Sequence, residues 1–273
     1  MRRPTIGVFD SGFGGLTVLK ALLEVLPAAD YLYFGDTARL PYGSKSAETV
    51  ARYAVEAAHF LEDQGAQILV IACNTATALA LDRIVVAAHV PVIGVVEPGA
   101  EAAAMATSNK KVVVIGTDAT VASHAYHNAL LARGLEAHEK ACPLLVPLVE
   151  EGWIDHEVTE QVASIYLGEA FAGGFEDADV LLLGCTHYPL LKPLLQRAVK
   201  SPTTIVDSAE STARMVAAGF KNFQPPTAEP QTERRGLPRF KFFVTDSVEK
   251  FRKLGPHFLG HSIDNVQHVD LKE

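Results

Sequence analysis

The chain has 273 residues, of which 48% are hydrophobic and 21% charged, as expected for a globular protein with a sizeable core. Its formal net charge of -8 and the lack of any Lys or Arg run argue against a basic nucleic-acid-binding surface. No apolar run approaches the length of a membrane span, and the N-terminal apolar stretch is too short for a signal peptide. The three cysteines lack the paired spacing of a disulfide framework or a zinc site. We therefore expect a cytoplasmic protein with reduced thiols, no metal site, and no nucleic-acid or membrane partner.

Short apolar runs alternate with helical patterns along the chain. The predicted strands are 5–9, 30–34, 68–72, 92–96, 112–115, 180–183, 204–206 and 240–244. The predicted helices are 15–26, 46–64, 76–88, 123–133, 156–172, 190–199, 209–220 and 247–254. Several strands are nearly continuous Val, Ile and Leu, which is typical of parallel strands buried on both faces. This alternation predicts an α/β fold whose ligands bind at the carboxyl ends of the strands.

Two pairs of segments are similar at nearly the same offset along the chain. The segment from Ile6 and the segment from Val114 each read as a strand, a small polar turn and a helix. The segments from Ile68 and Val180 each read as an apolar strand, a small residue, a cysteine, two polar residues and a helix. All α/β units share part of this pattern, but a cysteine at the same place in both favours a duplicated half.

Cys73 and Cys185 stand where a predicted strand ends and a helix begins. A lone cysteine after a strand is usually a small buried hydrophobe. A helix N-terminus, however, offers free N–H groups and a positive dipole end, which favour the thiolate and predict a lowered pKa. Polar residues that can cap a helix or bind a carboxylate follow the cysteines: Asn74, Thr75, Thr186 and His187. Cys142 has no such neighbours, and we interpret it as structural.

Two such thiols suit one kind of chemistry. If the halves face each other, the cysteines flank one substrate, and opposed bases can invert a carbon acid by removing a proton from one face and returning one to the other. A phosphatase loop would need arginine six positions after the cysteine, where Leu79 and Leu191 stand. A Cys–His hydrolase needs only one nucleophile. No lysine setting suggests a pyridoxal Schiff base, so we expect no cofactor.

Six motifs extend this pattern over nearly the whole chain. They are GVFDSGFGGLTV (7–18), GDTARLPYG (35–43), VIACNTATA (70–78), PLLVPLVEEG (143–152), GCTHYP (184–189) and VDSAE (206–210). On these motifs the chain resembles the glutamate racemases of the aspartate/glutamate racemase superfamily. The resemblance implies cofactor-independent interconversion of L- and D-glutamate by a two-cysteine, two-base proton transfer, which supplies D-glutamate for peptidoglycan synthesis. It also leads us to expect a homodimer.

The resemblance also assigns the site. Cys73 and Cys185 match the two catalytic acid/bases, and the assisting residues are Asp10, His187 and Glu150. Positions matching substrate-binding residues are Asp10, Ser11, Tyr42, Gly43, Asn74, Thr75, Thr186 and His187. Asp10 would orient the substrate ammonium or tune Cys73, and His187 would assist Cys185. The PLVE alignment selects Glu150 over Glu151.

Each motif also has an ordinary structural interpretation. The DSG at 10–12 could be a turn with a helix cap, and the PYG at 41–43 could be a plain turn. His187 could be a surface histidine, and Glu150 a solvated charge. The glycines of GFGG lack the spacing of a dinucleotide-binding loop. The coincidence of the motifs favours the functional interpretation.

We expect two similar three-layer α/β domains with mostly parallel sheets, related by a pseudo-twofold axis, with the active site in the cleft between them. By resemblance, one domain comprises residues 1–97 plus 207–273 and the other residues 98–206. Residues 221–239 predict a surface loop, and the tail after Gly260 a loosely held end. Two alternatives stay open: an aspartate racemase, in which we would expect an acidic residue in place of His187, and a two-lobed amino-acid-binding protein with inert cysteines.

Overall fold

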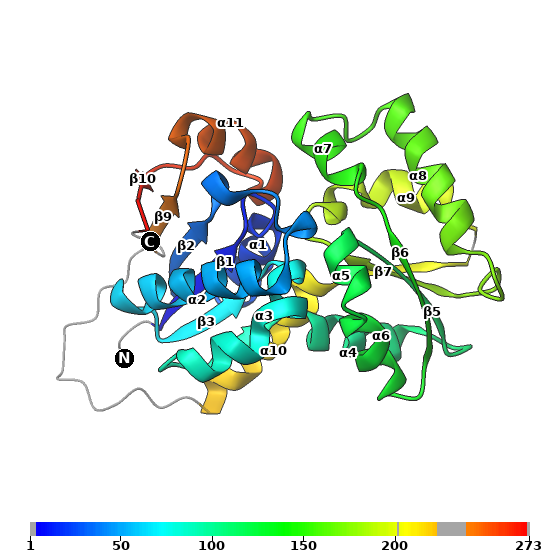
Figure 1. Cartoon of the computed structure of the whole chain (residues 1–273), viewed down its shortest axis with the longest axis horizontal. Helices are drawn as coiled ribbons and strands as arrows, with labels where there is room; N and C mark the ends of the chain where they lie inside the picture. The colour runs from blue at the N-terminus through cyan, green and yellow to red at the C-terminus, as the bar shows by residue number, and fades with distance from the viewer. Residues whose placement is uncertain (1–3, 201, 223–238, 272–273) are drawn as a thin grey trace.

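The computed structural model describes residues 4–200, 202–222 and 239–271. They form two parallel-sheet α/β domains, one built on a six-stranded sheet and one on a four-stranded sheet (Figure 1). Every strand pairing among these residues is parallel. The predicted fold class is therefore confirmed.

The six-stranded sheet has the order β10-β9-β2-β1-β3-β4. Its strands are β1 (Thr5–Asp10), β2 (Asp30–Gly35), β3 (Ile68–Ile71), β4 (Val92–Gly94), β9 (Phe240–Val244) and β10 (Val266–His268). The four-stranded sheet has the order β6-β5-β7-β8. Its strands are β5 (Lys111–Gly116), β6 (Glu136–Ala141), β7 (Val180–Gly184) and β8 (Thr204–Asp207).

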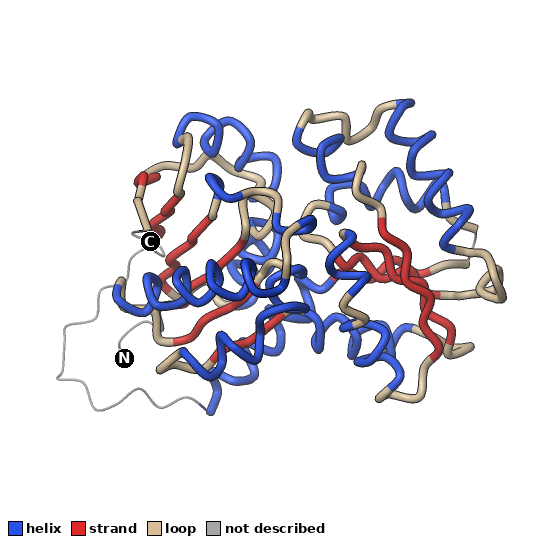
Figure 2. Tube along the Cα trace, in the orientation of Figure 1, coloured by secondary structure: helices blue, strands red, loops and turns tan. Residues whose placement is uncertain are grey.

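Helices lie on both sides of each sheet (Figure 2). Those of the six-stranded domain are α1 (Leu16–Val25), α2 (Ala47–Asp63), α3 (Asn74–Ala87), α10 (Ser208–Asn222) and α11 (Val248–Leu259). Those of the four-stranded domain are α4 (Val96–Ala106), α5 (Asp118–Ala122), α6 (Ala125–Leu131), α7 (Leu145–Glu150), α8 (Glu157–Ala170) and α9 (Lys192–Ala198). Three short 3-10 helices are η1 (Thr37–Arg39), η2 (Tyr42–Ser44) and η3 (Tyr188–Leu191). No helix in the described part of the chain is long and apolar enough to cross a membrane.

The apolar strands follow from this layering. Ile6 and Val8 of β1 pack in the core on the α1 side, whereas Phe9 packs in the core on the side of α2 and α3. Because both faces are covered, the strand is apolar at successive positions rather than at alternate ones. Each such side chain, fully buried, contributes about 1.5–3 kcal/mol of hydrophobic stabilisation.

The chain passes between the two sheets twice. It leaves the six-stranded sheet after β4 and enters α4, and it returns from β8 into α10 at Asp207 and Ser208. Helices α4 and α10 pack against each other beside these crossings. The crossings lie close to the predicted domain limits, and we retain 1–97 plus 207–273 and 98–206 as the proposed domains.

The structure corrects several predicted elements. Two strands were not predicted: β6, at the edge of the four-stranded sheet, and β10. The expectation of a loose tail after Gly260 is wrong, because Val266–His268 pairs with β9 as an added strand. The predicted helix 123–133 is shorter, since His124 has a φ of 55° and separates α5 from α6. Most of the loop predicted at 221–239 lies outside the described residues.

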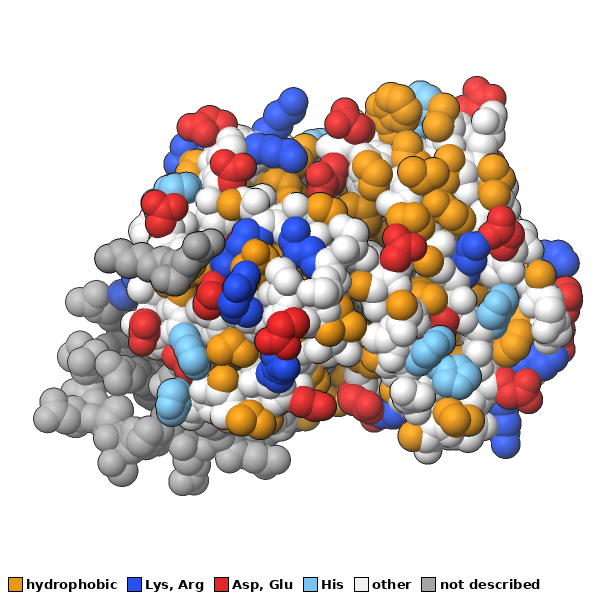
Figure 3. Space-filling view, viewed as in Figure 1, with side chains coloured by type: hydrophobic (Ala, Val, Ile, Leu, Met, Phe, Trp, Pro, Cys, Tyr) orange, Lys and Arg blue, Asp and Glu red, His pale blue; other side chains and the backbone are white. Residues whose placement is uncertain are grey.

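One stretch of surface is apolar. Hydrophobic side chains gather over α7 and α8 in the space-filling view (Figure 3). Its exposed large members are Leu144, Trp153, Val158 and Ile165. The cysteines are not among them, because the free thiols are all buried.

Candidate active site

Cys73 lies two residues beyond β3 and caps helix α3. Its Sγ accepts a hydrogen bond from the backbone N–H of Ala76 at 3.4 Å and donates one to Ser11 Oγ at 3.5 Å. Only 5% of the residue is exposed. The predicted placement at a helix N-terminus is therefore confirmed for this cysteine.

The predicted lowering of the pKa of Cys73 is wrong for this structure. Burial and, to a smaller extent, the nearby carboxylate of Asp10 raise the pKa of the thiol to about 12, although the N–H of Ala76 opposes them. The free-energy cost of removing a thiolate from water exceeds the stabilisation that one N–H donor and the helix dipole provide. Cys73 is therefore a protonated thiol at neutral pH.

Cys185 follows β7 directly, but no α-helix begins there, and only the short η3 starts at Tyr188. Its Sγ lies 4.0 Å from Nδ1 of His187, and Nε2 of the same ring lies 3.3 Å from Oε1 of Glu150. Lys250 Nζ lies 3.7 Å from the second carboxylate oxygen of Glu150. Glu150, at the end of α7, is thus the glutamate that contacts His187, whereas Glu151 is exposed.

This arrangement fixes the charge on the histidine. Burial favours the neutral imidazole, but hydrogen bonds to Cys185 and Glu150 and the charge of Asp10 outweigh it and raise the pKa of His187 to about 10. Partial burial opposes ionisation of Glu150, yet His187 and Lys250 hold the pKa of that carboxyl below its ordinary value. A buried imidazolium therefore stands beside Cys185 at neutral pH.

Asp10 lies at the end of β1 and is fully buried. Its Oδ2 accepts a hydrogen bond from Gly12 N–H at 2.9 Å, whereas Oδ1 has no partner among the described residues. Burial raises the pKa of Asp10, and the charge of His187 partly offsets it. Asp10 raises the pKa of Cys73 and also that of His187, the neighbour of Cys185. Its carboxyl is therefore close enough to interact with the surroundings of both cysteines.

Glycine-rich residues 12–15 pack directly on the second cysteine's motif. A Cβ on Gly14 would lie 2.2 Å from Thr186 Oγ1 and 2.6 Å from His187 Nδ1, so any side chain there would collide with the site. Thr17 Oγ1 donates to the carbonyl of Thr186 at 3.2 Å. The fold thus brings together two motifs that lie about 170 residues apart in the sequence. No local sequence pattern predicts this contact.

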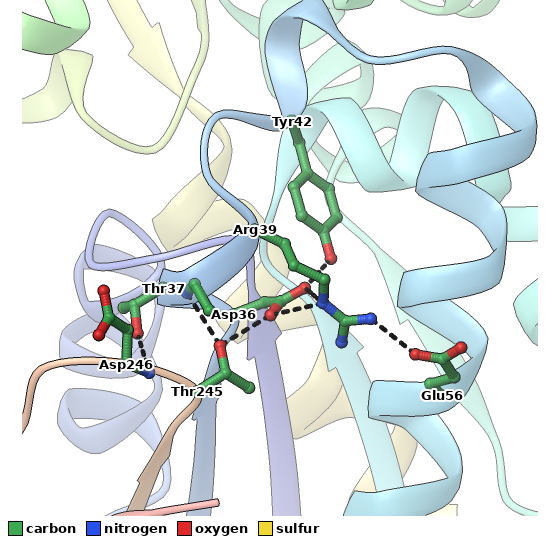
Figure 4. Close-up of polar contacts among 8 residues, drawn as sticks. Asp36, Thr37, Arg39, Tyr42, Glu56, Thr245 and Asp246 are labelled. Carbon is green, nitrogen blue, oxygen red and sulfur yellow. Dashed lines mark hydrogen bonds and ion pairs between the residues drawn. The ribbon is translucent and has the colours of Figure 1, made fainter. Parts of the chain in front are cut away.

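The hydroxyl of Tyr42, predicted to bind substrate, is hydrogen-bonded to another side chain of the protein. Its OH donates to Oδ2 of the buried Asp36 (Figure 4). Asp36 Oδ1 also accepts from Arg39 Nε at 3.0 Å and from Thr245 Oγ1 at 2.8 Å, and Arg39 reaches Glu56 at 2.7 Å. The Tyr42 hydroxyl is therefore bonded within the protein.

Gly43 brings this turn against the other domain. A Cβ on Gly43 would lie 2.9 Å from Thr117 Cβ. Thr117 belongs to a cluster of three hydroxyls, in which Thr75 Oγ1 lies 2.9 Å from Thr117 Oγ1 and 3.2 Å from Thr120 Oγ1. Thr117 and Thr120 were not predicted as site residues.

The other predicted residues also gather here. Asn74 and Thr186 are nearly buried beside the two cysteines. Asn74 Oδ1 accepts a hydrogen bond from Tyr126 OH at 2.6 Å, and its Nδ2 has no partner among the described residues. Cys142 is fully buried, and burial raises the pKa of its thiol to about 12. Within residues 4–200, 202–222 and 239–271, no group of His, Cys, Asp and Glu could hold a metal ion.

Comparison with known proteins gives the family. The family model described as Asp/Glu/Hydantoin racemase matches residues 6–216. The chain belongs to this family. Its relatives include a glutamate racemase of Koribacter versatilis, 61% identical over 288 aligned positions that cover 99% of this chain and 98% of that protein. A glutamate racemase of Geobacter metallireducens is 45% identical over 98% of this chain and 97% of its own.

Solved structures of this racemase family also match. The crystal structure of glutamate racemase from Francisella tularensis in complex with D-glutamate has a TM-score of 0.87 and 36% sequence identity. The match covers 98% of each chain. Both domains are therefore present in the related structure.

Proposed function

We propose that this racemase-family chain interconverts L- and D-glutamate without a cofactor, using Cys73 and Cys185 as opposed acid/bases. The observation that carries the proposal is the convergence of two cysteine groups, one from each sheet, around the buried carboxyl of Asp10. Support also comes from the glutamate racemases to which the chain is similar along nearly its full length.

In the proposed reaction the two thiols exchange roles. One thiolate removes the α-proton of glutamate, and the other thiol delivers its own proton to the opposite face of the α-carbon. The first sulfur ends as a thiol and the second as a thiolate, so protons balance without any external acid or base. Turnover in the reverse direction starts from this second protonation state.

The described protonation state suits one direction. Cys73 is a thiol that can donate a proton, because burial and Asp10 raise its pKa to about 12, and Cys185 Sγ lies 4.0 Å from Nδ1 of His187 on the opposite side of the proposed pair. Cys185 would therefore remove a proton and Cys73 would return one. By family resemblance Cys185 serves L-glutamate, so we propose that this state accepts the L enantiomer.

The substrate groups can be assigned by chemistry. The unpartnered Oδ1 of Asp10 suits the substrate ammonium, and the unpartnered Nδ2 of Asn74 suits a carboxylate. We propose further donors for the carboxylates in Ser11, Gly43, Thr75 and Thr186. Donors fixed in a buried site also stabilise the charge that develops on the α-carboxylate when the proton leaves.

Incubation of purified protein with L- or D-glutamate in deuterated water tests the function. We expect racemization and exchange of the α-proton for deuterium in both enantiomers, without pyridoxal phosphate or metal. Binding without exchange would indicate the amino-acid-binding alternative. Turnover of aspartate but not glutamate would indicate the other branch of the family.

A second experiment tests the opposed arrangement of the bases. Cys73→Ser and Cys185→Ser should each suppress racemization severely, since a hydroxyl is a far weaker acid than a thiol. Each variant should still eliminate a good β-leaving group from one enantiomer of a glutamate analogue, because elimination needs no proton return on the opposite face. The two variants should prefer opposite enantiomers, and a shared preference would refute the two-base mechanism.

The proposals on biological role, location and oligomeric state rest on the similarity to glutamate racemases. We propose that the D-glutamate supplies peptidoglycan synthesis in the cytoplasm and that the protein is a homodimer. Deletion of the gene should make growth depend on added D-glutamate, and sedimentation equilibrium of the purified chain should give twice the mass of 29.3 kDa.

A further inference from the structure

The side-chain amide of Asn74 is held on one side only. Asn74 is the first residue of α3 and is 3% exposed. Its Oδ1 accepts a hydrogen bond of 2.6 Å, while Nδ2, which carries two donor hydrogens, has no partner among the described residues. A buried unpaired donor is costly, so this N–H pair indicates a ligand that is absent from the free protein.

The group that holds Asn74 comes from the other domain. Tyr126 of α6 is fully buried, and its OH donates the hydrogen bond to Asn74 Oδ1. The ring is closely packed, since a Cβ on Gly184 would lie 3.0 Å from its Cε2 and a Cβ on Gly99 3.2 Å from its Cε1. The phenol therefore has little freedom to move away from the amide.

The direction of this hydrogen bond is also fixed. Burial raises the pKa of Tyr126, and a hydrogen bond from Ser208 lowers it by less, so the phenol keeps its proton. Ser208 starts α10, where the chain returns from β8 to the six-stranded domain. The phenol proton is therefore available to Asn74 Oδ1, which lies 2.6 Å from the phenol oxygen.

We propose that Tyr126 is a positioning residue for substrate binding: it holds the Asn74 amide so that both N–H groups, and not the oxygen, face the substrate carboxylate. The proposal rests on the proposed function in taking that carboxylate as the ligand of Asn74. Without the phenol proton, the amide can rotate by half a turn and present its oxygen to a negative charge. Because the phenol and the amide belong to different domains, the amide is oriented only while α6 is packed against α3.

Tyr126→Phe tests the proposal, because it removes the hydroxyl and keeps the ring. We expect KM for both enantiomers, and the dissociation constant of D-glutamate measured by calorimetry, to rise about tenfold, while kcat changes less than about twofold, since the loss of one hydrogen bond to a buried group is near 1.4 kcal/mol. The melting temperature reports whether the variant is folded.

Tyr31→Phe is the matched control. The Tyr31 hydroxyl is also buried, but it donates to the carbonyls of Leu22 and Leu26 inside the six-stranded domain. This variant should lose stability of similar size without a change in KM. If both tyrosine variants raise KM equally, the effect is general loosening, and the positioning role is wrong.

A double-mutant cycle separates positioning from direct binding. In an Asn74→Ala background, Tyr126→Phe should have no further effect on KM or on the dissociation constant, because there is no amide left to orient. Effects that multiply would overturn the proposal. A wild-type protein that binds D-glutamate but does not racemize it would refute the proposed function alone, and the cycle would then be measured on binding.

Discussion

At the scale of single residues, His187 has the property most open to measurement. With a pKa of about 10 it should remain an imidazolium at neutral pH, and nitrogen-15 NMR of histidine-labelled protein should show both ring nitrogens protonated at pH 8. A ring that titrates near 6.5, the ordinary value, would contradict the described network. In Glu150→Gln the pKa of His187 should fall, because one of the groups that raise it is neutralised.

The same shift has a consequence for stability. The folded pKa of His187 lies above the unfolded value of about 6.5, so the folded state binds the proton more tightly. Its contribution is complete below pH of about 6.5 and is lost as pH rises toward about 10. Urea unfolding of wild type and His187→Gln at several pH values should show the difference in unfolding free energy shrinking over that window. A difference that grows with pH would contradict this sign.

Cys142 provides a residue-level negative control. It is buried with its Sγ 3.6 Å from the carbonyl of Lys140, and it lies outside the group formed by Cys73, Cys185 and Asp10. Cys142→Ala should keep racemization within about threefold of wild type and lose about 1 kcal/mol of stability, as for removal of a small buried group. A loss of activity comparable to that of Cys73→Ala would show that its role has been misassigned.

The sequence pointed to some of these residues and not to others. Cys73 and Cys185 could be found because each stands at a strand end before polar residues, which is a local pattern. Tyr126 could not, since its partner Asn74 is 52 positions away and no spacing rule joins them. The sequence also suggested the pKa of Cys73 incorrectly, because a helix terminus is visible in a sequence whereas the degree of burial is not.

At the scale of elements, prediction worked where strands are buried on both faces. The Val, Ile and Leu runs of β5 and β7 lie inside the four-stranded sheet, and their composition indicates a strand directly. Strand β6 reads EAHEKA, with no β-branched residue, and is formed by pairing at the sheet edge with β5. Strand β10 has only three residues, too few for a periodic signal.

Helix α3 offers a test that separates structure from catalysis. Cys73 is its N-cap, and serine is a better N-cap than either cysteine or alanine. Cys73→Ser should therefore keep or raise the unfolding free energy, whereas Cys73→Ala should lose about 1 kcal/mol. Both variants should be almost inactive in racemization. If the two unfold at the same urea concentration, the cap does not stabilise the helix as described.

At the scale of the whole molecule, both cysteines are nearly shielded from solvent. Cys73 and Cys185 expose only 5% and 6% of their surfaces, so we expect substrate entry to require movement of the surrounding segments, from a closed to an open state. The hydroxyl cluster of Thr75, Thr117 and Thr120 joins the two domains beside the 42–43 turn. Breaking this cluster should favour the open state, because it lies at a contact between the domains and outside the core of either one.

Thiol labelling measures that opening. In native protein, labelling of Cys73 and Cys185 by a small alkylating reagent, read by mass spectrometry, should be slow. It should slow further with D-glutamate, whose proposed site lies between them. Thr117→Val removes the hydroxyl contacts and should speed labelling of both cysteines about fivefold, the effect of losing about 1 kcal/mol from the closed state. Labelling of Cys142 should change little, because that thiol is buried within one domain.

Thr117 is also the N-cap of α5, accepting from Thr120 N–H at 3.4 Å, so loss of the cap needs a control. Ser46 caps α2 in the same way, accepting from Thr49 N–H at 3.3 Å, but it lies outside the hydroxyl cluster. Ser46→Ala should lose similar stability without faster labelling of Cys73 or Cys185. Equal acceleration in both variants would mean that the thiols become accessible by general unfolding, and the separation of the two domains would then have no special part in substrate entry.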